Sequence, residues 1–299
     1  MSELRYDTVT LLSDYGHGDG FVGVVHSVIR QMAAGVNIVD LTHEISPFDV
    51  RGGSLVLARS VQYLCPGVII GLVDPAVGTT QRAIALEVAG GQAVLMGPDN
   101  GLLAPAVGLI GGSDRAIVLD NPEYLLATAA TTFTGRDVFA PAAAHLCSGV
   151  PFDELGTAVD SNSLMPGLVP LTSLEESPSG GQVLQSEVLW VDRFGNTQLN
   201  VDPDEIEGWG ERVNLRVGDT DRTARRVSAF GQLTTNELGL LVDADGLIAI
   251  IADRTSAADE LRLGPGDAVA ISVIDDDGPS IMVRTSVQIG RTKSAEGEL

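Results

Sequence analysis

The chain has 299 residues, 44% of them hydrophobic, and this length is typical of two domains rather than one. Forty acidic and 18 basic residues give a net charge of −22, which argues against nucleic acid and anionic membranes as partners because both require basic surfaces. The apolar runs are shorter than the about 18 residues of a membrane span, and the polar start "MSELRYD" is unlike a signal peptide. We therefore expect a cytoplasmic protein without a membrane segment.

The first half of the chain alternates between apolar runs and stretches with helical spacing. We expect strands at 8–13, 37–42, 67–73, 83–88, 93–97 and 115–120, and helices at 21–33, 50–64 and 135–149. This alternation predicts an α/β fold, with a mainly parallel sheet between helices on both faces as three layers.

The composition changes near residue 172, where a segment rich in Ser, Gly, Pro and Glu begins. Beyond it, short strands are separated by turns such as "DADG" and "GPGD", a pattern that suits an antiparallel β-barrel or sandwich. We therefore expect an N-terminal α/β domain at 1–172, a linker at 173–182 and a C-terminal β-barrel domain at 183–299.

Neither cysteines nor histidines suggest a metal. Cys65 and Cys147 lie far apart in apolar contexts, so we interpret them as buried free thiols. The four histidines have no spacing typical of zinc sites, and we expect no metal and no cofactor.

Three acidic residues, Asp14, Asp74 and Asp99, follow predicted strands directly. In parallel sheets, ligands bind beyond the carboxyl ends of the strands. The Gly-rich stretch "SDYGHGDGF" then suits either a ribose held by Asp14 or a turn in which Asp14 or Asp19 caps a helix. In "VDPAVGTTQR", Asp74 and Arg82 suit either an oriented water or a structural turn.

Two further motifs leave alternatives open. His145 in "GRDVFAPAAAHL" is either a core histidine of an Ala-rich helix or a general base. Asn196 in "VDRFGNTQLN" suits either the edge of a purine or a β-turn.

Taken in order, the motifs resemble one family, the S-adenosyl-L-methionine (SAM) hydrolases, or SAM hydroxide adenosyltransferases, which are homologous to the SAM-dependent fluorinase and chlorinase. The resemblance rests on "LLSDYG", "IVDLTHEISPFDVRGG", "VDPAVGT", "GPDNGLL", "GRDVFAPAAAHL", "VDRFGN" and "FGQLTTNELGLLVDADGLIAI". It implies an α/β domain, a β-barrel and a homotrimer with active sites at the subunit interfaces. The implied reaction is attack of water or hydroxide on the ribose C5′ of SAM, with adenosine and L-methionine as products.

The resemblance also implies roles for individual residues. The catalytic set is Asp74, His145 and an arginine, for which Gln81 and Arg82 are the candidates. The implied substrate contacts are to the ribose (Asp14), the methionine end (Asp19, Phe21, Asp192, Ala244, Asp245), an aromatic wall (Phe48) and adenine (Asn196, Phe230, and the backbone from Ala252 to Arg254), with Gly135 also in the substrate-binding set.

The sequence departs from the family pattern at three places. Gln81 stands where the hydrolases have the first of two arginines, Ala76 replaces a glycine, and Ala244 lacks the hydroxyl expected for the methionine carboxylate. The halogenases have a tyrosine at the position of Asp74, and a carboxylate there would repel a halide, so hydrolysis is favoured. The alternatives are a non-catalytic binder of adenosyl ligands, with a weakened catalytic set, and a SAM-dependent halogenase.

Overall fold

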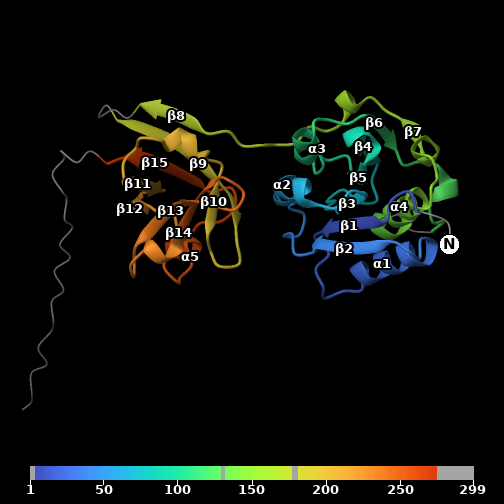
Figure 1. Cartoon of the computed structure of the whole chain (residues 1–299), viewed down its shortest axis with the longest axis horizontal. Coiled ribbons are helices and arrows are strands. Elements are labelled where there is room, and N and C mark those ends of the chain that lie inside the picture. Colours follow the sequence, from blue (N-terminus) through green and yellow to red (C-terminus); the bar gives the residue numbers. More distant parts are fainter. Residues whose placement is uncertain (1–3, 129–131, 177–180, 275–299) are drawn as a thin grey trace, which may run out of the picture.

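Two domains make up the computed structural model, which describes residues 4–128, 132–176 and 181–274 (Figure 1). The N-terminal domain contains a seven-stranded sheet in the order β2-β1-β3-β5-β4-β6-β7. Its strands are β1 (Thr8–Ser13), β2 (Asn37–Thr42), β3 (Val68–Leu72), β4 (Ala83–Val88), β5 (Ala93–Pro98), β6 (Arg115–Val118) and β7 (Thr157–Ala158). The run β2-β1-β3-β5 is parallel, whereas β4, β6 and β7 pair antiparallel.

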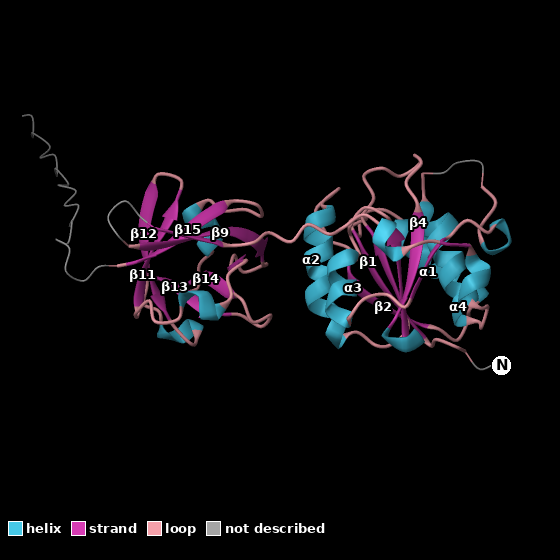
Figure 2. Ribbon diagram, turned by 90° about the horizontal axis from the view of Figure 1, so that it is seen from above, coloured by secondary structure: helices cyan, strands magenta, loops and turns pink. Residues whose placement is uncertain are grey.

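Helices cover both faces of this sheet. Figure 2 shows α2 (Val50–Ser60) and α3 (Ala104–Ile110) on one face, and α1 (Phe21–Met32) and α4 (Ala140–Cys147) on the other. In α1, Val22, Val25 and Ile29 are buried, as the helical spacing of its apolar residues requires. Strands β1 and β3 are buried throughout because both of their faces are covered. The expected three-layer α/β domain is therefore confirmed.

The C-terminal domain is a closed barrel with one additional strand. Pairing between β9 and β10 closes the barrel, and β8 adds to β9 outside it. The strands are β8 (Ser173–Glu176), β9 (Gln182–Val191), β10 (Thr197–Leu199), β11 (Arg212–Val217), β12 (Thr220–Arg226), β13 (Leu238–Val242), β14 (Ile248–Ala252) and β15 (Ala268–Val273), with the short helix α5 (Ala257–Leu261). All pairs are antiparallel except β12 with β13, so the expected barrel is confirmed with one parallel pair.

Several local expectations differ from the structure. Residues 173–176, expected within the linker, form β8, and the expected domain residues 275–299 lie outside the described part. Cys147 is buried as expected, but Cys65 is exposed, because it lies in the turn before Pro66 and not inside the preceding helix. Both thiols are free.

The two domains contact each other through α2 and β9. Arg51 of α2 forms an ion pair with Glu187, and the guanidinium of Arg59 lies 4.9 Å from the centre of the Trp190 ring. Within the described residues, no helix combines the length and hydrophobicity needed to cross a bilayer.

Candidate active site

The carboxyl ends of the neighbouring strands β1 and β3 bring Asp14 and Asp74 to one pocket of about 390 Å³. Asp14 follows β1 directly, and Asp74 lies two residues beyond β3. The pocket is lined by Asp14, Tyr15, Asp19, Phe21, Pro47, Phe48, Leu72, Asp74, Val77, Pro98, Thr132, Phe133, Thr134 and Phe139. Five predicted site residues thus gather in the N-terminal domain alone.

Asp74 is held by the turn that follows it. Its Oδ1 accepts a hydrogen bond from the Ala76 amide at 3.0 Å, whereas its Oδ2 has no hydrogen bond within the described part of the chain. Gly78, with φ of +81°, takes the left-handed position, and Ala76 avoids it, as the replacement of glycine at this site requires. Burial raises the pKa of Asp74, and the nearby charge of Asp14 raises it further.

Asp14 fixes an unusual backbone at Phe48. The Phe48 amide donates to Asp14 Oδ2 at 2.9 Å, and Phe48 has a φ of +68°, a conformation that is costly for a bulky residue. Phe48 is 70% exposed and lines the pocket. The strained backbone therefore presents an aromatic ring to the pocket, where the predicted aromatic wall was expected.

Three aromatic rings form one wall of the pocket. Tyr15, Phe21 and Phe133 contact one another with ring centres 5.0–5.8 Å apart. Gly135 does not line the pocket but makes room for this wall, since a Cβ there would lie 2.7 Å from the Tyr15 hydroxyl. Burial, followed by the charges of Asp14 and Asp74, raises the pKa of Tyr15, so its hydroxyl stays protonated at neutral pH.

Neither candidate for the arginine position contacts Asp74. The Gln81 side chain donates to the carbonyl oxygen of Asp99, and Arg82 donates through Nε to Asp99 Oδ2 at 2.9 Å. Arg82 also bonds the carbonyl of Ser163 at 3.1 Å. The expected pairing of an arginine with Asp74 is therefore absent between these residues, because Asp99 binds both side chains.

His145 lies away from Asp74 as well. Gly135 and His145 are ten residues apart, which corresponds to about 15 Å along a helix, so His145 lies at the far end of α4. Its ring packs edge-on against Tyr124 with centres 5.0 Å apart, and burial lowers its pKa. The structure thus favours a packing role for the half-buried His145, and the polar residues just before this helix that line the pocket are Thr132 and Thr134.

We expect His145→Gln to leave kcat for the reaction proposed below within about twofold of the wild type, because His145 does not line the pocket that holds Asp74 and only groups that contact the reacting atoms differently in the transition state change the chemical step. Steady-state rates with SAM, together with a thermal melt, would measure this. A loss of a hundredfold in a folded variant would instead return His145 to the catalytic set.

The remaining predicted residues gather in a second pocket, on the barrel, of about 650 Å³. Asp192, Asn196, Phe230, Ala244 and Asp245 all line it. Asn196 donates through its side-chain amide to Asp192 Oδ2 at 2.7 Å and through its backbone amide to Asp192 Oδ1 at 2.9 Å. This leaves the Asn196 side-chain oxygen to accept a bond from a ligand.

The acidic turn of the barrel pocket, which contains Asp243 and Asp245, is hydrogen-bonded by one neutral side chain and lies near one cation. Gln198 donates to Asp243 Oδ2 at 2.6 Å and to Asp245 Oδ2 at 3.0 Å. Arg59 of the N-terminal domain lies 3.8 Å from Asp245. Ala252 and Arg254 do not line this pocket, and the Arg254 side chain is 93% exposed. The contact expected here was one of the backbone from Ala252 to Arg254, and it stays a prediction.

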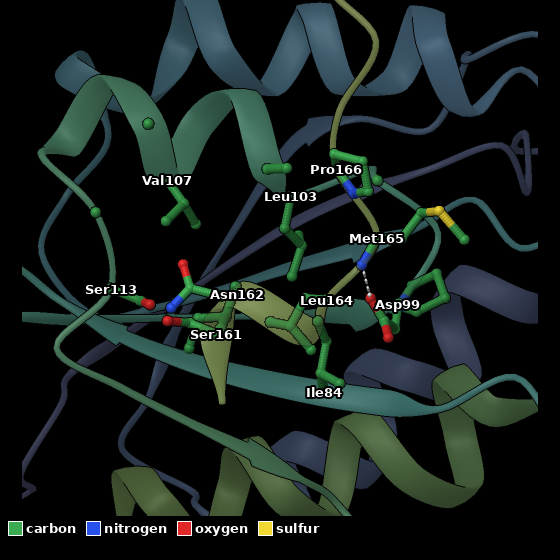
Figure 3. Close-up of a pocket in the computed structure, with 16 residues that line it drawn as sticks. Ile84, Asp99, Leu103, Val107, Ser113, Ser161, Asn162, Leu164, Met165 and Pro166 are labelled. Atoms are coloured by element: carbon green, nitrogen blue, oxygen red, sulfur yellow. Dashed lines mark hydrogen bonds between the residues drawn. The ribbon is translucent and has the colours of Figure 1, made fainter. Parts of the chain in front are cut away.

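Asp99 lines a third pocket, of about 370 Å³ (Figure 3). It lies between α3 and the segment that carries Met165 and Pro166, with Leu103, Val107, Ile84 and Leu164 facing its interior. Asp99 is buried, and its Oδ1 accepts the Met165 amide at 2.8 Å. Its Oδ2 accepts from Arg82, so Asp99 holds this segment in place, and it lines neither the pocket around Asp74 nor the barrel pocket.

Comparison with known proteins places these features in a family. The chain matches the models of the SAM hydroxide adenosyltransferase N-terminal domain over residues 9–156 and C-terminal domain over residues 186–270. It is 40% identical to the (R)-S-adenosyl-L-methionine hydrolase of Salinispora tropica, over 88% of this chain and 97% of that relative. A fluorinase of Actinoplanes sp. is 27% identical over 70% of this chain and 77% of its own.

A solved structure shares the fold. The crystal structure of an uncharacterized conserved protein from Thermotoga maritima aligns with a TM-score of 0.79 at 31% identity, over 88% of this chain and 99% of that one. The protein combines an α/β domain, which has a carboxylate pocket at its strand ends, with a β-barrel domain, and the two matched domain models follow in the same order. The chain belongs to the SAM hydroxide adenosyltransferase family, as its motifs predicted.

Proposed function

We propose that this protein hydrolyses SAM to adenosine and L-methionine, and that Asp74 positions the attacking water. The observation that carries this proposal is a half-buried carboxylate with one free oxygen, at a strand end, in a pocket that also holds Asp14. The names of the relatives support the same reaction.

The geometry suggests how the residues divide the work. Asp74 Oδ1 is fixed by the Ala76 amide, so Oδ2 is left to accept a proton from water. The water oxygen attacks C5′ of the ribose in line with the C–S bond, and the electron pair of that bond leaves with methionine. Oriented reactions of this kind gain up to ~7–11 kcal/mol from positioning.

Charge in the pocket favours the substrate and disfavours a halide. Asp14, Asp19 and Asp74 are acidic, and the aromatic wall offers ring faces to the sulfonium cation. Two carboxylates flanking a halide would repel it. A single carboxylate is a weak base toward water, so we propose that the water is only partly deprotonated in the transition state.

We further propose that a complete site combines the N-terminal pocket of one subunit with the barrel pocket of another, in a homotrimer. Two observations support this arrangement. The pocket around Asp74 has no lining residue from the barrel, and the barrel pocket has only Arg59 from the N-terminal domain. The ribose-facing and adenine-facing groups would then meet only between chains.

The test is incubation of the purified protein with SAM, with and without chloride, followed by chromatography. We expect adenosine and methionine in equal amounts under both conditions. A chlorinated nucleoside would identify a halogenase, and intact SAM with tightly bound adenosine would identify a non-catalytic binder; either result would overturn the proposal.

The acid limb of the pH profile, where kcat/KM falls as the pH drops, should lie above the pKa of an ordinary carboxyl group. Asp74 must be ionised to accept a proton, and burial together with Asp14 raises its pKa, so kcat/KM should fall as the pH drops through that raised value. Asp14→Asn removes the negative charge that raises the pKa of Asp74, so the acid limb of the profile should move to lower pH. A pH profile of kcat/KM for both proteins measures this, and an unmoved limb would exclude Asp74 as the titrating group.

A further inference from the structure

Three of the four histidines gather beside the loop that carries Asp14, and two of them share a carboxylate. His26 of α1 and His43, which follows β2, each place Nε2 near Asp40 Oδ1 of β2, at 2.9 and 3.0 Å. The three ligand atoms all lie within 4.8 Å of one another. The His17 ring packs edge-on against His43, with centres 5.4 Å apart.

His43 is the residue that makes this cluster unusual. It is 2% exposed, and its Nε2 makes no hydrogen bond within the part of the chain that the structure describes, although it lies 3.0 Å from Asp40 Oδ1. A buried ring nitrogen without a partner is costly. A cation between His43 Nε2 and Asp40 would satisfy both groups at once.

The other nitrogen of His43 is already fixed. His43 Nδ1 lies 2.6 Å from the Ser13 hydroxyl, which is fully buried. When Nδ1 carries the proton and donates to Ser13, Nε2 presents its lone pair to the cluster. Metal-binding histidines generally have such a second partner, which fixes the tautomer and the ring orientation.

We infer that His26, Asp40 and His43 form a binding site for a divalent transition metal of the zinc type. Two imidazoles and one carboxylate are a donor set that suits zinc, with a remaining position for water, whereas magnesium and calcium prefer oxygen ligands alone. Zinc lies about 2.0–2.2 Å from such ligands, so the observed spacing requires only small side-chain movements.

The proposed metal site is connected to the substrate pocket through the backbone of the Ser13–Gly16 loop. Ser13 precedes Asp14, and the Gly16 amide donates to the His43 carbonyl at 2.8 Å. A bound ion would therefore fix the Ser13–Gly16 loop, from which Asp14 and Tyr15 enter the pocket. This is a positioning role, separate from the reaction proposed above.

Zinc titration of chelator-treated full-length protein by calorimetry tests the inference without using activity. We expect one zinc ion per chain, with affinity lowered at least about 100-fold by His26→Gln or Asp40→Asn, since even outer partners of metal ligands contribute about 10–100-fold. Gln retains a donor toward Asp40 but is a poor zinc ligand, so His26→Gln should keep the fold. His145→Gln, the histidine outside the cluster, should bind zinc as the wild type does.

Thermal melts add a second readout. Zinc should raise the melting temperature of the wild type and of His145→Gln, but not of His26→Gln. Equal zinc binding in all variants would mean only general attraction to the acidic surface, and absence of zinc binding by the wild type would mean a plain hydrogen-bond network; both results would overturn the inference.

Discussion

Asp74→Asn should lower kcat for SAM hydrolysis by about 10²–10⁴-fold, the usual contribution of a positioned general base. The amide has the same shape as the carboxylate and can still accept the bond from Ala76, but it cannot take a proton from water. Affinity for adenosine should change little, since Asp74 faces the attacking water. Adenosine release by chromatography and adenosine binding by calorimetry measure the two quantities.

Asp219→Asn is the matched control for this variant. It removes the same charge from an exposed turn between β11 and β12, and should leave kcat and the adenosine affinity unchanged. A rate for Asp74→Asn within tenfold of the wild type would show that the carboxylate is not needed for the chemistry.

Mixing two inactive variants should restore activity when each complete site uses two chains. Asp74→Asn disables the N-terminal pocket, and Phe230→Asp places a charge in the barrel pocket where the adenine would stack. After dissociation and random reassembly of equal amounts, about one quarter of the sites would combine two intact halves. Steady-state rates of the mixture, compared with each variant alone, give the result.

Asp74→Asn mixed with Asp14→Asn serves as the control: both substitutions lie in the same pocket, so mixing should add nothing to the summed rates of the two variants measured alone. Tagged subunits would show that mixed oligomers form. Mixed oligomers that stay inactive would mean that each chain builds its own complete site.

Much of the fold could be predicted because its strands have simple patterns. The buried runs that became β1 and β3 are continuous apolar stretches, and α1 has clear helical spacing. Helix α3 was not predicted, since Ala104–Ile110 is short and contains a proline and a glycine. Strand β8 was also missed, because its alternation is weak and it adds only at the edge of the barrel.

Residues at strand ends could be placed together from the sequence, whereas contacts between distant loops could not. Asp14 and Asp74 could be placed together because parallel strands end at one edge. Phe133 and Thr134 could not, since their loop reaches Tyr15 only through packing of the whole domain. The pairing of Arg82 with Asp99, and the cluster of His26, Asp40 and His43 from separate elements, have no signal in local spacing.

The partial burial of Asp74 has a consequence for folding as well as for chemistry. Its pKa is higher in the folded chain than in the unfolded one, so the folded state holds a proton at pH values between the ordinary value of 3.8 and the raised one, where the unfolded state has lost it. Stability from this group is therefore full below the lower value and is lost as the pH rises through the higher one. The ionised carboxylate is the form that performs the reaction and also the form that destabilises the folded state. The active site therefore lowers the stability of its own domain.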